Sequence, residues 1–406
     1  MGRLLRKFSS GICFERASTR TIAVLVLVIA TMSTAAQPSK QITANPDPSL
    51  PFSAAVKADG LIYVSGVLGT GGDIKTQTRQ VLERINTTLK SAGSSLANAA
   101  SMTVYLRNQG DVAAMNDVYR TYWTKDPPAR TTVVVPLLND GLVEIAAVAV
   151  PDGSERVAVN PGGWMVAPNP YSYAIKSGST LFLAGLISRN GKDNSAIQGD
   201  MAAQTKTVMD NGAAVLAAAG MSYGDVVSSR VYITDPAAFQ EMNTAYRAYF
   251  PADPPARATV KALLTSSDYS VEITMVAVRS ANRTAVTTPA ADGTPGAKNA
   301  NLSSAIRVGS RLYISGMLGN TPANTGDAKA QTREALLRIG RTLEAAGFDW
   351  TTVVDGAVYL PDLTQFADMN ASYREPFPRN FPARATVGAG LMGADAAVEM
   401  MFTATK

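Results

Sequence analysis

The chain of 406 residues is long enough for two or three domains, and its apolar content of 46% is ordinary for a folded protein. The absence of histidine excludes a Ser-His-Asp triad and every histidine-ligated zinc or haem site, and a single cysteine excludes an intramolecular disulfide. The 37 basic against 32 acidic residues give a net charge of +5, so the location of this charge decides whether it indicates an acidic partner.

The first 36 residues have the pattern of a secretory signal. They hold five basic residues and one acidic residue, and an apolar run from Thr21 to Met32 is followed by small residues up to Ala36. This order is typical of an export signal that is cleaved after Ala35 or Ala36, and a retained N-terminal anchor is the alternative. We therefore expect a periplasmic or extracellular protein. Without the signal, 32 basic and 31 acidic residues remain, so the mature protein is almost neutral.

Three copies of one unit follow the signal. The tripeptide Pro-Ala-Arg occurs at 128–130, 255–257 and 382–384, with a spacing of 127 residues each time. Met-Asn, Tyr-Arg and Gln-Thr pairs repeat with the same period, which indicates an internal repeat. The predicted domains are 52–151, 171–280 and 301–406. The remaining segments, rich in proline, glycine and polar residues, are predicted linkers at 37–51, 152–170 and 281–300.

The first half of each repeat is predicted to be a hairpin followed by a helix. In the first repeat, Asp59-Gly60 separates two apolar runs and predicts a tight hairpin turn. Apolar residues then recur at helical spacing between Val81 and Leu89, and Gly93 stands where a left-handed residue would end the helix.

The second half is predicted to contain a strand, a second helix and two more strands. The strand covers 101–106, and Asp111 is a good N-cap for the helix, which must end before Pro127. The last strands cover 131–138 and 143–150. The order ββαβαββ predicts an α+β fold in which two helices cover one face of a sheet.

The other face of such a sheet is apolar and needs a partner. Three units in one chain can cover one another around a pseudo-three-fold axis, with three sheets inside and six helices outside. We therefore expect a monomer that forms an intramolecular pseudo-trimer.

The assembled unit resembles the reactive intermediate deaminase family (Rid, YjgF-type or L-PSP-like) over nearly all of 52–406. The resemblance rests on several motifs of the first repeat and their counterparts: Gly60-Leu-Ile-Tyr-Val-Ser-Gly66, Gln77-Thr78, Met115-Asn116-Asp-Val-Tyr119, Pro128-Ala129-Arg130-Thr-Thr132-Val and Val143-Glu144-Ile-Ala. Members are usually homotrimers of a chorismate-mutase-like domain with ligand clefts between subunits. The chain is similar to such a trimer written as one polypeptide.

The resemblance implies hydrolysis of 2-imino acids and their enamine tautomers, such as 2-iminobutanoate or 2-iminopropanoate, to 2-keto acids and ammonia, with no metal or organic cofactor. It implies that an arginine binds the substrate carboxylate and that a glutamate orients or activates water. The candidate residues are the arginines Arg130, Arg257 and Arg384, the glutamates Glu144, Glu272 and Glu399, the asparagines Asn116, Asn243 and Asn370, the threonines Thr132, Thr259 and Thr386, and the single residues Tyr171, Ser65 and Ser315.

The chemistry of these residue types agrees with that implication. A guanidinium matches a carboxylate through two parallel hydrogen bonds, and a partly desolvated glutamate can relay a proton without histidine. We therefore expect each arginine to face a cleft between two repeats, open to solvent and within reach of a glutamate. The alternative is a structural ion pair at an interface. The asparagines have a structural alternative as well, hydrogen bonding to backbone groups, and Tyr105, Tyr232 and Tyr359 are interpreted as packing residues.

Differences among the repeats predict unequal clefts. Where the second repeat has Tyr171, the others have Phe52 and Leu302, and Ala184 replaces the serine found at 65 and 315. This favours, as an alternative function, a small-carboxylate-binding module without turnover. A ribonuclease is disfavoured because the mature chain is nearly neutral and lacks a basic or aromatic stripe. We expect no nucleic-acid partner, and no membrane association after signal cleavage.

Overall fold

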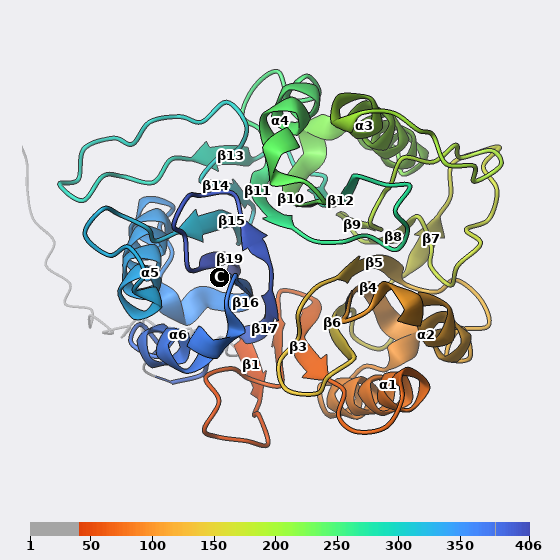
Figure 1. Ribbon diagram of the computed structural model, residues 1–406, viewed down its shortest axis with the longest axis horizontal. Helices are drawn as coiled ribbons and strands as arrows, with labels where there is room; N and C mark the ends of the chain where they lie inside the picture. Colours follow the sequence, from red (N-terminus) through yellow and green to blue (C-terminus); the bar gives the residue numbers. More distant parts are fainter. Residues whose placement is uncertain (1–39, 378) are drawn as a thin grey trace, which may run out of the picture. The chain divides into compact units, whose positions relative to one another are not determined.

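The computed structural model describes residues 40–377 and 379–406, and these form three α+β repeats (Figure 1). The predicted signal at 1–36 lies outside the described residues. In the part of the chain that the structure describes, no helix is both long enough and apolar enough to cross a membrane.

Each repeat follows the predicted order of elements, with one more strand at its start. The first repeat contains β1 (Lys40–Thr43), β2 (Ala55–Ala58), β3 (Leu61–Leu68), α1 (Ile74–Ser91), β4 (Ala99–Leu106), α2 (Val112–Tyr119), β5 (Ala129–Val134) and β6 (Val143–Ala149). The second contains β7 (Val157–Val159), β8 (Ala174–Ser177), β9 (Thr180–Leu183), α3 (Met201–Ala218), β10 (Val226–Ile233), α4 (Phe239–Arg247), β11 (Ala256–Lys261) and β12 (Val271–Val278). The third contains β13 (Arg283–Val286), β14 (Ala305–Val308), β15 (Arg311–Leu318), α5 (Ala328–Ala345), β16 (Val353–Leu360), α6 (Phe366–Tyr373), β17 (Ala383–Gly388), β18 (Gly390–Leu391) and β19 (Glu399–Thr405).

The predicted hairpin and the first helix are confirmed. Asp59 and Gly60 have φ of 47° and 72°, the left-handed values that a tight turn between antiparallel β2 and β3 requires. The side chain of Asp73 caps α1 by accepting a hydrogen bond from the Thr76 backbone N–H at 2.8 Å. Gly93, just after the helix, has φ of 78°.

Asp111 occupies the N-cap position of α2, as predicted, but its side chain makes no capping hydrogen bond to the helix. A 3₁₀ turn (Gln109–Asp111) leads into α2, and the Asp111 carboxylate accepts a hydrogen bond from the Asn108 side chain at 3.0 Å. In the other repeats, Asp235 and Asp362 cap the corresponding 3₁₀ turn through backbone N–H groups two residues later. The position of side-chain capping therefore lies before the turn, where the first repeat has Asn108.

The last strand of each repeat lies inside its sheet rather than at the edge. In the first sheet the order is β1-β2-β3-β6-β4-β5, where β6 is antiparallel to both neighbours and β5 is parallel to β4. A parallel neighbour requires a crossover, which α2 provides.

The segments predicted as linkers also contribute to the sheets. Strands β1, β7 and β13 lie within 37–51, 152–170 and 281–300, and they pair with β2, β8 and β14. Without them, each hairpin would leave a row of backbone N–H and C=O groups unpaired at a sheet edge.

The helices of each repeat pack on one face of its sheet, and the other faces of the three sheets pack on one another. A shared apolar cluster contains residues of all three repeats, among them Tyr105, Tyr232 and Tyr359, of which Tyr232 and Tyr359 have hydroxyls 3.5 Å apart. The packing role predicted for these tyrosines is confirmed. Strand β18 also crosses from the third repeat to pair with β11 of the second. The three repeats therefore form an intramolecular pseudo-trimer, as predicted, with α1–α6 on the outer faces of the sheets (Figure 1).

Candidate active site

Each candidate arginine is the second residue of a strand that begins directly after a proline: Arg130 in β5, Arg257 in β11 and Arg384 in β17. The proline ends the preceding segment, and the strand direction turns the arginine toward a neighbouring repeat. The side chains are 5%, 2% and 2% exposed. Each guanidinium lies over the ring of a tyrosine at the end of the second helix, at 4.7 Å for Tyr119, 4.8 Å for Tyr246 and 4.5 Å for Tyr373.

A glutamate from the next repeat lies on the other side of each arginine. Glu272 of β12 accepts a hydrogen bond from the backbone N–H of Thr132 in the first repeat at 3.1 Å. At the equivalent positions, the backbone N–H of Thr259 acts to lower the pKa of Glu399, and that of Thr386 acts to lower the pKa of Glu144. We call these site 1 (Arg130 and Glu272), site 2 (Arg257 and Glu399) and site 3 (Arg384 and Glu144). Because site 3 joins the third repeat to the first, the arrangement closes into a ring.

The arginine and the glutamate of a site do not form an ion pair. Among residues 40–377 and 379–406, none of the three pairs has a nitrogen–oxygen distance of 4.0 Å or less. The alternative of a structural ion pair is therefore contradicted. Each site instead places a cation and an acid across a gap.

Several polar atoms of each site have no hydrogen-bond partner among the described residues. Two guanidinium nitrogens of every arginine and the hydroxyl of every threonine two residues later are buried without a partner: in site 1 Arg130 Nε and Nη1 with Thr132 Oγ1, in site 2 Arg257 Nε and Nη1 with Thr259 Oγ1, and in site 3 Arg384 Nε and Nη2 with Thr386 Oγ1. Buried polar groups are nearly always paired, so these donors are available in each site to an oxygen acceptor, either water or a bound molecule.

Burial changes the acidity of both charged groups. Desolvation raises the pKa of Glu144, Glu272 and Glu399 to about 8, against the opposing effects of the threonine N–H and the arginine. Desolvation also lowers the pKa of the three arginines, that of Arg384 to about 10. Each glutamate can therefore carry a proton at neutral pH while the arginine beside it stays charged.

A glycine makes room for each carboxyl group. A β-carbon on Gly66, Gly185 or Gly316 would overlap the carboxylate of the facing glutamate, Glu144, Glu272 or Glu399 respectively. Only glycine allows this close approach of backbone to carboxyl.

The serines before two of these glycines hold the arginine backbone. Ser65 accepts a hydrogen bond from the Arg384 backbone N–H at 2.8 Å and donates to the carbonyl of Ser53 at 2.5 Å. Ser315 does the same for Arg257 at 2.8 Å and donates to Ser303 at 2.6 Å. Their hydroxyl hydrogens are already donated, so their contacts are those of positioning residues. Site 1 has Ala184 here and lacks this contact.

The asparagines differ among the sites. The side-chain carbonyl of Asn243 accepts a hydrogen bond from Arg257 Nη2 at 2.6 Å. In the other sites the corresponding oxygens of Asn116 and Asn370 are buried without a partner, and Asn116 donates to Asn169 at 3.2 Å. The hydrogen bond between asparagine and arginine therefore belongs to site 2, where Asn243 binds Arg257.

The expectation of solvent-open arginines is wrong. The ring of Phe52 lies 5.2 Å from the Arg384 guanidinium and the ring of Tyr171 lies 5.9 Å from that of Arg130, both from the neighbouring repeat. Tyr171 also lines an outer cavity of about 550 Å³, and Leu302, at the equivalent position of site 2, lines one of about 900 Å³. Phe52 and Tyr171 therefore help to cover the arginines of sites 3 and 1.

The contact of Tyr119 with the arginine was not predicted from the sequence. The signal was present, because a Tyr-Arg pair recurs at 119, 246 and 373 with the period of the Pro-Ala-Arg tripeptide. From the sequence, a tyrosine on an apolar helix face is interpreted as a packing residue. Only the fold brings its ring under the guanidinium.

Comparisons with known proteins agree with this architecture. The family model "Endoribonuclease L-PSP" matches residues 42–151, 164–279 and 294–406. A RutC family protein of Pyrococcus horikoshii is 44% identical over 113 residues, which cover 26% of this chain and 90% of that protein. The 3-aminoacrylate deaminase RutC of Acinetobacter baylyi is 42% identical over 113 residues, with 26% and 90% covered.

A solved chorismatase structure is similar to the chain as a whole in fold alone. It matches with a TM-score of 0.54 and 16% identity, covering 76% of this chain and 93% of that one. With the family model matched three times, the chain belongs to the endoribonuclease L-PSP family, also called the Rid family, and carries three copies of the family domain in one polypeptide.

Proposed function

We propose that the protein hydrolyses 2-imino acids and their enamine tautomers to 2-keto acids and ammonia at the three sites between repeats. The observation that carries this proposal is the buried guanidinium whose free N–H groups face a glutamate of another repeat without forming an ion pair with it. The sequence similarity to a 3-aminoacrylate deaminase supports the same reaction class.

The substrate carboxylate would bind to the free guanidinium nitrogens and to the threonine hydroxyl of the site. Charge-assisted hydrogen bonds from these nitrogens would fix the position of the carboxylate. The tyrosine under the guanidinium holds the cation in place from its other side. The imine carbon, attached directly to the carboxylate, then lies on the side of the glutamate.

The glutamate would serve first as acid and then as base. With a pKa of about 8 it is protonated at neutral pH, and it can give its proton to the imine nitrogen. Water then attacks the carbon, and the carboxylate takes up a proton from it. The resulting carbinolamine breaks its carbon–nitrogen bond, with release of ammonia and formation of the keto acid. One imine and one water give one keto acid and one ammonia.

The test is to form 2-iminobutanoate or 2-iminopropanoate in the assay and to follow keto-acid or ammonia release. We expect acceleration over buffer, and loss of this acceleration when Arg130, Arg257 and Arg384 are all changed to alanine. Equal rates with and without the protein, for every imine tried, would refute the proposal. A carboxylate that raises the melting temperature without turnover would identify a binding module instead.

A further inference from the structure

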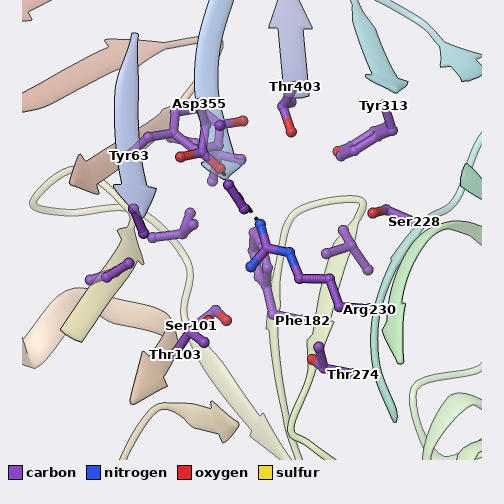
Figure 2. Close-up of a pocket in the computed structure, with 18 of the residues that line it drawn as sticks. Tyr63, Ser101, Thr103, Phe182, Ser228, Arg230, Thr274, Tyr313, Asp355 and Thr403 are labelled. Carbon is purple, nitrogen blue, oxygen red and sulfur yellow. Dashed lines mark ion pairs between the residues drawn. The ribbon is translucent and has the colours of Figure 1, made fainter. Parts of the chain in front are cut away.

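A cavity of about 90 Å³ lies where the three sheets meet, separate from the three sites (Figure 2). Its walls come from equivalent positions of β4, β10 and β16, together with Tyr63, Phe182 and Tyr313 from the hairpins. Because all three repeats contribute the same positions, we call it the axial cavity.

The repeats differ in chemistry at this cavity. One lining position, with the repeat period of 127, holds Thr103, Arg230 and Ala357, and the position two residues before it holds Ser101, Ser228 and Asp355. The axial cavity therefore has one guanidinium and one carboxylate. Three identical chains would place three like charges around the axis, at a high electrostatic cost in a partly desolvated space. A single chain with diverged repeats avoids that cost.

The two charges face each other without a hydrogen bond. Arg230 Nη2 and Asp355 Oδ2 are 4.0 Å apart, and Figure 2 shows the Arg230 side chain reaching across the cavity toward Asp355. The side chains keep 26% and 20% of their surface exposed. Within residues 40–377 and 379–406, the Arg230 guanidinium donates no hydrogen bond to another residue at the distances that define one, so its donors point into the cavity.

Arg311, also close to the contact of the three repeats, shows what a structural arginine looks like in this molecule. Its guanidinium donates to the Asp59 carboxylate at 2.6 Å, to the Asp59 carbonyl at 2.8 Å and to the Thr180 hydroxyl at 2.8 Å. This arginine links residues of all three repeats, and each of its three guanidinium nitrogens donates a hydrogen bond. This contrast indicates that Arg230 and Asp355 are placed to bind another molecule in the axial cavity.

We propose that the axial cavity binds a small zwitterion, an α-amino acid of the size of glycine or alanine. The ligand's carboxylate would bind to Arg230 and its ammonium group to Asp355, with the hydroxyls of Ser101 and Ser228 beside them. A buried water occupies about 10–15 Å³, so a cavity of about 90 Å³ has room for a molecule of several such atoms. A large side chain does not fit.

Titration calorimetry on the full chain tests this inference. We expect glycine or alanine to bind with one site per chain, and acetate or methylammonium, each carrying one of the two charges, to give no binding at the same concentrations. The chain itself offers matched variants: Arg230→Thr gives the second repeat the residue of the first, and Asp355→Ser gives the third the residue of the other two. Each should weaken binding at least tenfold while keto-acid release stays unchanged.

The results that overturn the inference are equally distinct. No heat and no rise in melting temperature with either amino acid would refute it. So would three sites per chain, or binding that survives Arg230→Thr, because these results would place the ligand at the inter-repeat sites. If a variant does not fold, the comparison of glycine with acetate and methylammonium on the unaltered chain still decides. The titration does not depend on imine turnover, so its result supports or refutes binding in the axial cavity independently of the proposed reaction.

Discussion

The carboxylate of Glu272 accepts a hydrogen bond from the backbone N–H of Thr132 at 3.1 Å, although the two residues lie 140 positions apart in different repeats. This contact places the acid of one repeat opposite the arginine of another. The other two sites pair the same residue types, Glu399 with the backbone of Thr259 and the first repeat's Glu144 with the backbone of Thr386, as shown by their effects on the glutamate pKa. Every site is therefore complete only when two repeats are assembled.

The arginines are expected to contribute site by site. A single change of Arg130, Arg257 or Arg384 to alanine should remove the keto-acid release of one site and leave the others, and the triple variant should lose about a hundredfold or more in kcat/KM. A charge-assisted hydrogen bond is worth about 1.5–3 kcal/mol, and two are lost per site. Lysine variants, which keep the charge but not the fork, are the matched control. Full activity in the triple variant would contradict the assignment.

The raised glutamate pKa predicts a stability profile with a defined sign. The three carboxyls ionise near 8 in the folded protein and near 4.5 in the unfolded chain. Between these values the folded state holds protons that the unfolded state has released, so the free energy of unfolding falls as the pH rises from 4.5 to 8 and changes no further above 8.

Melting temperatures measured from pH 4.5 to 9 check this profile. The triple variant Glu144→Gln, Glu272→Gln and Glu399→Gln should show a flatter slope in that window, because glutamine does not titrate. An identical slope in the variant and the unaltered chain would show that the glutamates ionise normally.

The close approach of Gly185 to Glu272 predicts a steric effect. Gly185→Ala would force its β-carbon into the carboxylate, so we expect a loss of stability of about 1–3 kcal/mol and the loss of site 1 activity. Gly110→Ala is the control, because no atom lies within 4 Å of a β-carbon there. Denaturant unfolding of both variants measures the difference, and equal stabilities would argue against the overlap.

The serine contacts predict opposite effects on stability for two reverse substitutions in different sites. Ser65→Ala should leave the buried Arg384 backbone N–H without its partner, at a cost of about 1–3 kcal/mol. The reverse change, Ala184→Ser, offers the Arg130 backbone the contact that site 1 lacks. We expect the first variant to unfold at lower denaturant concentration and the second at equal or higher concentration. Equal midpoints for Ser65→Ala and the unaltered chain would remove the positioning role.

The N-terminal signal is open to a direct measurement. In a bacterial host with an export pathway, the mature chain should begin at Ala36 or Gln37, which the intact mass would show. A full-length chain that fractionates with membranes would identify a retained anchor.

Much of the fold could be predicted because it depends on residues that are close to one another in the sequence. The turn at Asp59-Gly60 follows from residues that accept left-handed backbone, and the helix from Val81 to Leu89 from the spacing of its apolar side chains. The order of strands in the sheet could not be predicted from the sequence. The strand Val143–Ala149 lies between β3 and β4, a position that depends on packing of the whole unit. The edge strand β1 was missed because its segment lacks an apolar pattern, although its Ile42 packs against an apolar cluster.

By itself, the sequence determined the three repeats, their common fold and the residue types of the site, since each is written three times at fixed positions. Only the tertiary structure decided which glutamate meets which arginine, that the guanidinium is closed off under Tyr171 or Phe52, and that Arg230 and Asp355 face one cavity. The physical reason is that these contacts join different repeats. They depend on which faces of the sheets pack against one another, and the spacing of residues along the chain does not predict this packing.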